Sequence, residues 1–194
     1  MIRCGVLTFH RASNYGAVMQ TYALQKILNR LGAQSEVIDY RSESIERHIL
    51  PVKLYTLIDP RRFKSLILKN NFILDNREKF SEFVRNYITI SINIYTADDI
   101  KKTNGLYDVF ITGSDQVWNN ICAGFDKTYF LDFVDDASKK NAYSASLGFT
   151  KFPDGTIGIY KQLLSDFNHI SVREKQGTEL LRKTMGKDVI NTLD

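Results

Sequence analysis

Cysteine, proline and tryptophan are scarce in this chain, whose 194 residues include two cysteines, three prolines and one tryptophan. Cys4 and Cys122 form no CxxC pair and have no histidine at the spacing of a metal ligand, which argues against a zinc site or a disulfide framework. We expect both to be small apolar packing residues, and the sequence predicts no metal and no cofactor. Because no proline-rich linker, low-complexity stretch or internal repeat divides the chain, we expect a single domain over residues 1–194.

Long apolar runs are also missing. No stretch approaches the roughly 18 to 20 apolar residues that a membrane-spanning helix needs. The first nine residues are too short and too interrupted for a signal peptide, so we expect a cytoplasmic protein. A composition of 43% hydrophobic and 25% charged residues is typical of a soluble globular protein and excludes a disordered or collagen-like chain.

The formal net charge of +4 is concentrated in residues 41–87, which hold ten Lys or Arg and six Asp or Glu. Two interpretations stay open for this basic segment, whose centre is Arg61–Lys69. It could be the outer face of ordinary amphipathic helices, or it could contact an anionic partner such as the inner face of a membrane. Nucleic acid is not an expected partner, because no binding motif is present and acidic residues are interspersed.

Strand patterns and helix patterns alternate along the chain. An apolar run at 2–9, a helical pattern that ends before Gly32, and a second strand at 35–40 form a strand–helix–strand unit. Further strands are predicted at 108–112, 140–145, 169–173 and 188–192, with a short helix beginning at 97–100 and a longer one at 174–185. The sequence therefore predicts an α/β fold of the Rossmann-like, doubly wound kind with a mostly parallel sheet.

The basic segment 41–87 interrupts this alternation and is predicted to be a helical insertion. It contains patterns for at least two amphipathic helices. The clearer one carries apolar residues at helical spacing, namely Phe80, Phe83, Val84 and Tyr87.

Polar residues follow the first strand, at the edge where open α/β sheets bind ligands. Ser13, Asn14 and Gly16 directly precede the predicted helix, whose N–H groups and positive dipole end could hold a phosphate or carboxylate. The same residues are typical of a turn, and both interpretations stay open. His10 could act there as an acid or base, or lie on the surface. The dinucleotide fingerprint and the P-loop are excluded, because neither G-x-G-x-x-G nor Gly-Lys-Ser/Thr is present.

A denser polar segment, Gly113–Asn119, follows the strand at 108–112. It combines a hydroxyl, a carboxylate, two amides and the only tryptophan of the chain. Aromatic faces stack on sugar rings, while Asp, Asn and Gln exchange hydrogen bonds with hydroxyls, so the segment is suited to sugar binding. In the alternative interpretation Trp118 fills the core and Asp115 caps the next helix.

A third candidate, Ser171–Glu174, ends the strand at 169–173. Arg173 could clamp a phosphate or carboxylate, or it could form an ordinary ion pair with Glu174. No catalytic dyad is evident from the sequence.

Taken in order, these segments resemble the polysaccharide pyruvyl transferase family. The resemblance covers nearly the whole chain and rests on Thr8–His10, Asn14–Ala17, Gln20, Tyr22–Leu24, Gly113–Asn119, Tyr129–Phe133, Tyr143–Gly148 and Ser171–Glu174. It implies transfer of a pyruvyl group from phosphoenolpyruvate to two hydroxyls of a sugar, forming a ketal on a cell-surface polysaccharide or its lipid-linked precursor. It also implies one half of a GT-B-type fold, with the active site in the cleft between two Rossmann-like halves.

The resemblance also implies roles for individual residues. Asp115 and Arg173 are the candidate catalytic residues, with Arg173 toward the negative charge of the donor. The candidate substrate-binding residues are His10, Asn14, Tyr15, Gly16, Gln20, Gly113, Ser114, Gln116, Trp118 and Asn119. The implied partners are a sugar or polysaccharide acceptor and phosphoenolpyruvate. The chemistry needs an acid for the enol methylene, cations for the carboxylate and phosphate, and a base for the hydroxyl protons.

Members of this family are longer than the present chain, which we expect to hold only their N-terminal half. The missing half would carry most donor-binding basic residues, so we expect the chain to bind the acceptor and to be inactive alone. Two other classes stay open. One is a non-catalytic glycan-binding or assembly module that forms a homo-oligomer through its uncovered cleft face. The other is half of a nucleotide-sugar glycosyltransferase, which nucleotide would stabilise.

Overall fold

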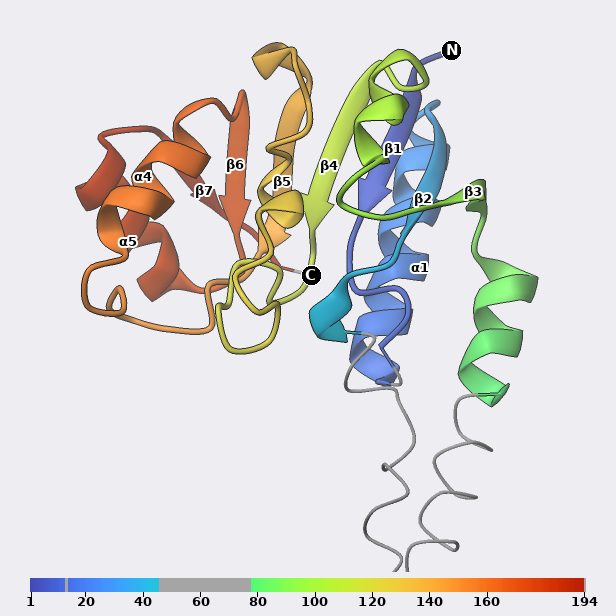
Figure 1. Ribbon diagram of the computed structural model, residues 1–194, viewed down its shortest axis with the longest axis horizontal. Coiled ribbons are helices and arrows are strands. Elements are labelled where there is room, and N and C mark those ends of the chain that lie inside the picture. Colours follow the sequence, from blue (N-terminus) through green and yellow to red (C-terminus); the bar gives the residue numbers. More distant parts are fainter. Residues whose placement is uncertain (13, 46–77, 194) are drawn as a thin grey trace, which may run out of the picture.

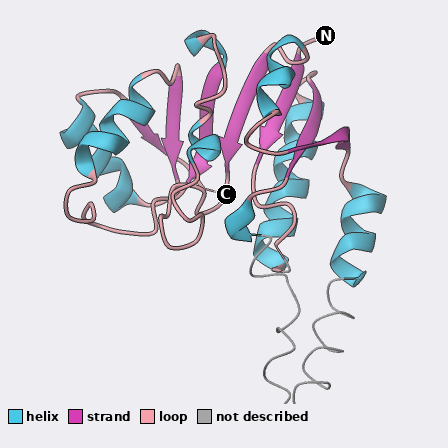
Figure 2. Cartoon of the chain, in the orientation of Figure 1, coloured by secondary structure: helices cyan, strands magenta, loops and turns pink. Residues whose placement is uncertain are grey.

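The computed structural model describes residues 1–12, 14–45 and 78–193. Seven parallel strands form one sheet with helices on both faces (Figures 1 and 2). The strands are β1 (Arg3–Leu7), β2 (Gln34–Tyr40), β3 (Ile90–Tyr95), β4 (Val109–Gly113), β5 (Lys140–Ala145), β6 (His169–Val172) and β7 (Val189–Asn191). The α-helices are α1 (Tyr15–Arg30), α4 (Ile157–Ser165), α5 (Lys175–Met185) and a helical segment at 78–87. Short 3-10 helices η2 (Ile100–Gly105), η3 (Lys127–Phe130) and η4 (Ala137–Lys139) lie in the connections.

The strand order is β3-β2-β1-β4-β5-β6-β7, and every neighbouring pair is parallel. The chain runs outward from β1 through β2 to β3, then returns to place β4 on the other side of β1. This reversal makes the gap between the carboxyl ends of β1 and β4 the topological switch point, where doubly wound sheets bind their ligands. The predicted Rossmann-like α/β fold is confirmed.

The two faces of the sheet bury two separate clusters, because successive side chains of a strand point in opposite directions. Cys4 and Val6 of β1 join the cluster under α1 and the helical segment 78–87, whereas Leu7 joins the larger cluster on the other face. That larger cluster also takes Tyr160 of α4 and Leu181 of α5. Figure 1 accordingly shows α1 beside β1 and β2, and α5 beside β6 and β7.

Most predicted elements occur within a residue or two of their predicted bounds. Gly32 follows the end of α1 with a φ of 91°, and Gly186 closes α5 with a φ of 65°, as expected for residues after a helix. The short helix predicted to begin at 97–100 is wrong in its start: residues 97–99 form a turn, and the helix begins at Ile100 as a 3-10 helix. Asp99 explains the shift, because its Oδ1 atom accepts the N–H of Thr96 at 2.7 Å and stabilises the turn.

The basic segment 41–87 connects β2 to β3 at the edge of the sheet. Its predicted helix with Phe80, Phe83, Val84 and Tyr87 is confirmed at 78–87. The other predicted helix and the basic centre Arg61–Lys69 lie outside the described residues. Within the described ranges, no helix has both the length and the apolar character needed to span a membrane.

Candidate functional site

Buried polar atoms without a hydrogen-bond partner gather near the carboxyl ends of the strands. In the part of the chain that the structure describes, these atoms belong to Thr8, Gln20, Arg41, Glu174 and Thr192. Thr8, Arg41 and Thr192 directly follow β1, β2 and β7, and Glu174 lies two residues after the end of β6. An unsatisfied buried polar group costs about 1–3 kcal/mol, so such groups collect where a ligand or partner can satisfy them. The carboxyl edge of the sheet is therefore the candidate functional site.

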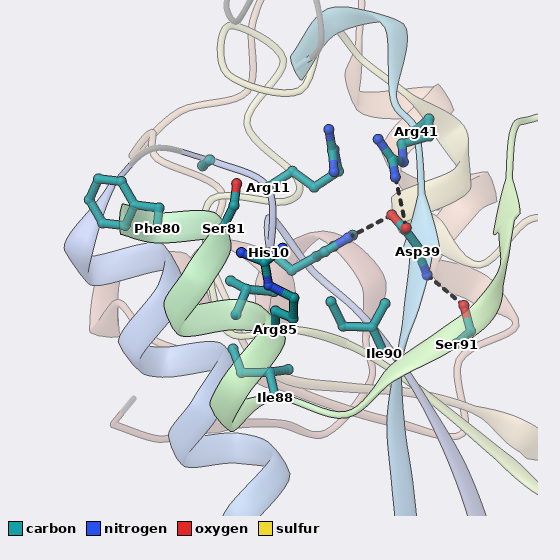
Figure 3. A pocket seen from close by; sticks show the side chains of 12 residues that line it. His10, Arg11, Asp39, Arg41, Phe80, Ser81, Arg85, Ile88, Ile90 and Ser91 are labelled. Carbon is teal, nitrogen blue, oxygen red and sulfur yellow. Dashed lines mark hydrogen bonds and ion pairs between the residues drawn. The ribbon is translucent and has the colours of Figure 1, made fainter. Parts of the chain in front are cut away.

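His10 lies at this edge as part of a side-chain pair (Figure 3). It is only 3% exposed, its Nε2 atom lies 3.1 Å from Oδ1 of Asp39, and its Nδ1 atom lies 3.3 Å from the carbonyl oxygen of Thr8. Both neighbours are hydrogen-bond acceptors, so the two contacts fix the orientation of the imidazole ring in the cavity wall.

Asp39 forms hydrogen bonds in three directions. Besides His10, Nη2 of Arg41 donates to its Oδ2 atom at 2.8 Å, and its backbone N–H donates to Oγ of Ser91 at 2.9 Å (Figure 3). Burial alone would raise the pKa of the carboxyl, but the hydrogen bonds and positive charges of His10 and Arg41 outweigh it and lower the pKa to about 2. Asp39 is therefore a carboxylate that holds the side chains of His10 and Arg41 in place.

A cavity of about 540 Å³ opens beside this pair. Among the residues that the structure describes, its ionisable lining consists of Asp39, His10 and three arginines, Arg11, Arg41 and Arg85. The arginines come from three different elements: the loop after β1, the end of β2 and the helical segment 78–87. Of these five residues, the sequence predicted only His10 as a site residue. Asp39 and Arg41 could have been found as well, because they stand at the end of the predicted strand 35–40 and therefore at the same edge of the sheet as His10.

The loop before α1 uses its polar groups locally. Asn14 is the N-cap, and its Oδ1 atom accepts the N–H of Gly16 at 2.8 Å and that of Ala17 at 3.3 Å. Gly16 therefore lies inside the first turn, and an anion at this helix end would first have to displace the Asn14 side chain. Tyr15 is 76% exposed, with its ring 4.8 Å from that of Phe80. Ser13 lies outside the described residues.

Gly113 and Ser114 occupy the switch point itself. Gly113 has a φ of 115°, and a Cβ atom there would lie 2.1 Å from the carbonyl oxygen of Tyr143 in the neighbouring strand β5, so this position requires glycine. The Oγ atom of buried Ser114 donates to Oε1 of Gln20 at 3.4 Å, and Nε2 of Gln20 is one of the unpartnered atoms. The structure thus brings together Ser114 and Gln20, which are 94 residues apart in the chain.

The remaining polar residues of the segment after β4 bond to one another. Nδ2 of Asn119 and Sγ of Cys122 both donate to Oε1 of Gln116, at 2.9 and 3.2 Å. The Oδ1 atom of Asp115 accepts the backbone N–H of Gln116 at 2.7 Å. Gly148 lies against this group, because a Cβ atom there would come within 2.1 Å of Nδ2 of Asn119.

Trp118 does not belong to the polar surface. Its side chain is 1% exposed, it stacks on Phe130 with ring centroids 5.7 Å apart, and its Nε1–H donates to the carbonyl oxygen of Tyr129 at 3.1 Å. The prediction that Trp118 stacks on a sugar is wrong, because the ring is covered by the core. Of the two interpretations that the sequence left open for Trp118, the one in which its side chain fills the core applies.

Arg173 lies after β6 and is bound to Glu174. Its Nε atom lies 3.1 Å from Oε1 of Glu174, which also accepts the hydroxyl of Ser146 at 2.6 Å. Ser146 in turn donates its backbone N–H to the carbonyl oxygen of Asp115 at 2.9 Å. This chain of contacts links Arg173 to the segment after β4 through the end of β5. Arg173 is not among the residues that line the His10 cavity.

The described residues contain no group of three or more His, Cys, Asp or Glu side chains that could hold a metal ion. In a comparison with known families, the family model for polysaccharide pyruvyl transferase matches residues 14–194. No match to a curated protein or to a solved structure was found. The matched range spans almost the entire chain, including the segments after β4, β5 and β6. The chain therefore belongs to the polysaccharide pyruvyl transferase family.

Proposed function

We propose that this chain is the acceptor-binding half of an enzyme that transfers a pyruvyl group from phosphoenolpyruvate to two hydroxyls of a sugar. The product is a ketal on a cell-surface polysaccharide or on its lipid-linked precursor at the cytoplasmic side of the membrane. The observation that carries this proposal is the hydrogen bond between Ser114 and Gln20 at the switch point, in a chain that belongs to this family. The two side chains offer a hydroxyl and an amide, which are the groups that bind sugar hydroxyls.

The reaction defines what the site must supply. C2 of phosphoenolpyruvate forms two bonds to sugar oxygens and loses its phosphate, while its methylene carbon gains a proton and becomes a methyl group. Of the two protons that the hydroxyls lose, one balances the methyl group and the other leaves with the phosphate. A base next to the hydroxyls and an acid next to the methylene carbon are therefore needed.

We assign the base role to Asp115 and the binding of acceptor hydroxyls to Ser114, Gln20, Gln116 and Asn119. Asp115 directly follows Ser114, and its carboxylate already accepts the N–H of Gln116, so it is oriented by the loop that carries the hydroxyl-binding groups. Arg173 is the candidate for the negative charge of the donor. To bind the donor it would have to exchange part of its contact with Glu174 for the donor's phosphate or carboxylate.

Thermal unfolding with and without ligands tests this proposal, because a ligand that binds only the folded state raises its apparent stability. We expect a panel of neutral sugars to raise the Tm of the chain and Asp115→Asn to reduce that rise. Asp154→Asn is the matched control, since Asp154 is fully exposed on a loop. We also expect no pyruvyl transfer by the chain alone.

Two results would contradict the proposal. If no sugar raises the Tm and the chain forms a dimer that persists on dilution, it is an assembly module instead. If nucleotides raise the Tm and sugars do not, the chain binds the kind of ligand that nucleotide-sugar glycosyltransferases bind. Unchanged turnover of an active enzyme that carries Asp115→Asn would remove the base role alone.

A further inference from the structure

The cavity beside His10 is not explained by the binding of neutral sugar hydroxyls. We propose that it is a phosphate site, which takes a phosphate ester through Arg11, Arg41 and Arg85. The assignment of that phosphate to the sugar acceptor rests on the proposed function. The phosphate chemistry itself rests on the cavity alone.

Charge is the first argument. Among the described residues of the lining, three arginines stand beside a single carboxylate, and Asp39 is already engaged with His10 and Arg41. This part of the lining therefore carries more positive than negative charge. An arginine guanidinium presents parallel N–H donors that match phosphate oxygens and stays charged at every accessible pH. One of these donors, Nε of Arg41, has no partner among the described residues.

His10 supports this arrangement through its contacts. Its Nε2 atom lies 3.1 Å from Oδ1 of Asp39, and its Nδ1 atom lies 3.3 Å from the carbonyl oxygen of Thr8. Both ring nitrogens are therefore engaged inside the protein, and His10 holds the Asp39 carboxylate that in turn fixes Arg41.

The walls and the size of the cavity are the second argument. Val84, Ile88 and Ile90 form an apolar floor next to the arginines, and charge-assisted hydrogen bonds are stronger where water is partly excluded. A volume of about 540 Å³ lies within the roughly 300–1,000 Å³ of known ligand sites. It leaves room for a phosphate together with part of the group that carries it.

The position along the sheet suggests how the phosphate is joined to the sugar. The cavity lies at the carboxyl ends of β1 and β2, and the Ser114 and Gln20 pair lies at the switch point between β1 and β4. The two sites therefore adjoin the same strand from its two sides. A sugar phosphate with its hydroxyls at Ser114 would direct its phosphate toward the arginines.

Titration of the chain with inorganic phosphate at constant ionic strength tests the site. We expect binding by calorimetry, together with a change in the ring ¹⁵N signals of His10, assigned among the three histidines of the chain. Arg85→Gln should weaken binding by about tenfold, the loss of one charge-assisted hydrogen bond. Arg85 is exposed, so this variant should fold. Arg30→Gln is the control, because Arg30 is equally exposed at the opposite end of α1.

Further ligands separate the two sources of phosphate. If sugar 1-phosphates bind more tightly than the matching sugars, and Arg85→Gln abolishes the difference, the phosphate belongs to the acceptor. If instead phosphoenolpyruvate binds more tightly than pyruvate, and Arg85→Gln abolishes this difference in affinity, the phosphate belongs to the donor. Phosphate binding without any effect of neutral sugars would uphold the phosphate site while the proposed function failed. Equal binding of phosphate by the wild type and Arg85→Gln, or none by either, would overturn the inference.

Discussion

The Nε2 atom of His10 lies 3.1 Å from the Oδ1 atom of Asp39, and this contact joins the loop after β1 to the carboxyl end of strand β2. Arg41 completes the group by donating to the other carboxylate oxygen at 2.8 Å. A single partly buried carboxylate thus fixes His10 and Arg41, which line the same cavity. The preorganisation of the site depends on Asp39, although Asp39 carries the wrong charge to bind an anion itself.

Replacing Asp39 with Asn should lower the stability of the fold in a pH-dependent way. The pKa of Asp39 is lowered to about 2 from its ordinary value of 3.8, so its ionised form stabilises the folded state above pH 4, and this contribution is lost as the pH falls from about 4 to about 2. At neutral pH, Asp39→Asn should cost about 2 kcal/mol. Urea unfolding at several pH values measures it.

The control for this prediction is Asp188→Asn. Asp188 is 88% exposed and lies 3.8 Å from Arg182, so its loss should change the stability by less than about 0.5 kcal/mol. The curves of wild type and Asp39→Asn should converge near pH 2. A constant difference between them from pH 7 to pH 2 would show that Asp39 acts through packing and not through its charge.

The reactivity of Cys122 should report on Asp115. Burial raises the pKa of the Cys122 thiol, and the nearby Asp115 charge raises it further. Asp115→Asn removes that charge, lowers the pKa and increases the thiolate fraction at pH 8, so alkylation by iodoacetamide should become roughly twofold faster. Cys4 is the internal control, because it is 1% exposed and burial raises its pKa to about 12. An unchanged rate in Asp115→Asn would place the carboxylate too far from the thiol to matter.

Trp118 should behave as a core residue and not as a sugar platform. Trp118→Ala removes a ring that stacks on Phe130 and leaves the carbonyl oxygen of Tyr129 without its donor, so it should lower the free energy of unfolding by about 3–5 kcal/mol. Trp118→Phe keeps most of the volume and should cost less. Saturating sugar should leave the intrinsic fluorescence of Trp118 unchanged, and strong quenching would indicate that the ring is accessible after all.

The sequence predicted the elements that carry strong local patterns. The apolar runs of β1, β2 and β4, and the glycines after α1 and α5, made those elements recognisable. Edge strand β3 was missed because Ile92 and Ile94 alternate outward on an exposed edge, so the run lacks the continuous apolar character of a buried parallel strand. Helix α4 was missed because Gly158 and the β-branched Ile157 and Ile159 weaken its helical pattern.

The sequence predicted the candidate site only in part. Strand ends located His10, Ser114 and Asp115 at one edge, because parallel strands share their carboxyl edge. Neither the pairing of His10 with Asp39 nor the convergence of three arginines was predictable, since both depend on how β2 and the helical segment 78–87 pack around β1. Trp118 was misassigned for a related reason: composition shows that a polar loop contains a tryptophan, but not which way the ring points.

Gly113 at the switch point should tolerate substitution far less well than Gly186, although both have a positive φ. At Gly186 an alanine would be strained only by the φ of 65°, since a Cβ atom there has nothing within 4 Å. Gly186→Ala should therefore lower the free energy of unfolding by about 1–2 kcal/mol. At Gly113 the φ is 115° and the added Cβ would lie 2.1 Å from the carbonyl oxygen of Tyr143. To remove this clash, β4 and β5 would have to move apart, and that movement would also displace Ser114 from Gln20. Gly113→Ala should therefore cost more than about 4 kcal/mol and abolish sugar-dependent stabilisation, measured by urea unfolding and by thermal unfolding with sugars. Equal losses of stability in the two variants would mean that strands β4 and β5 are not held as closely as the structure shows.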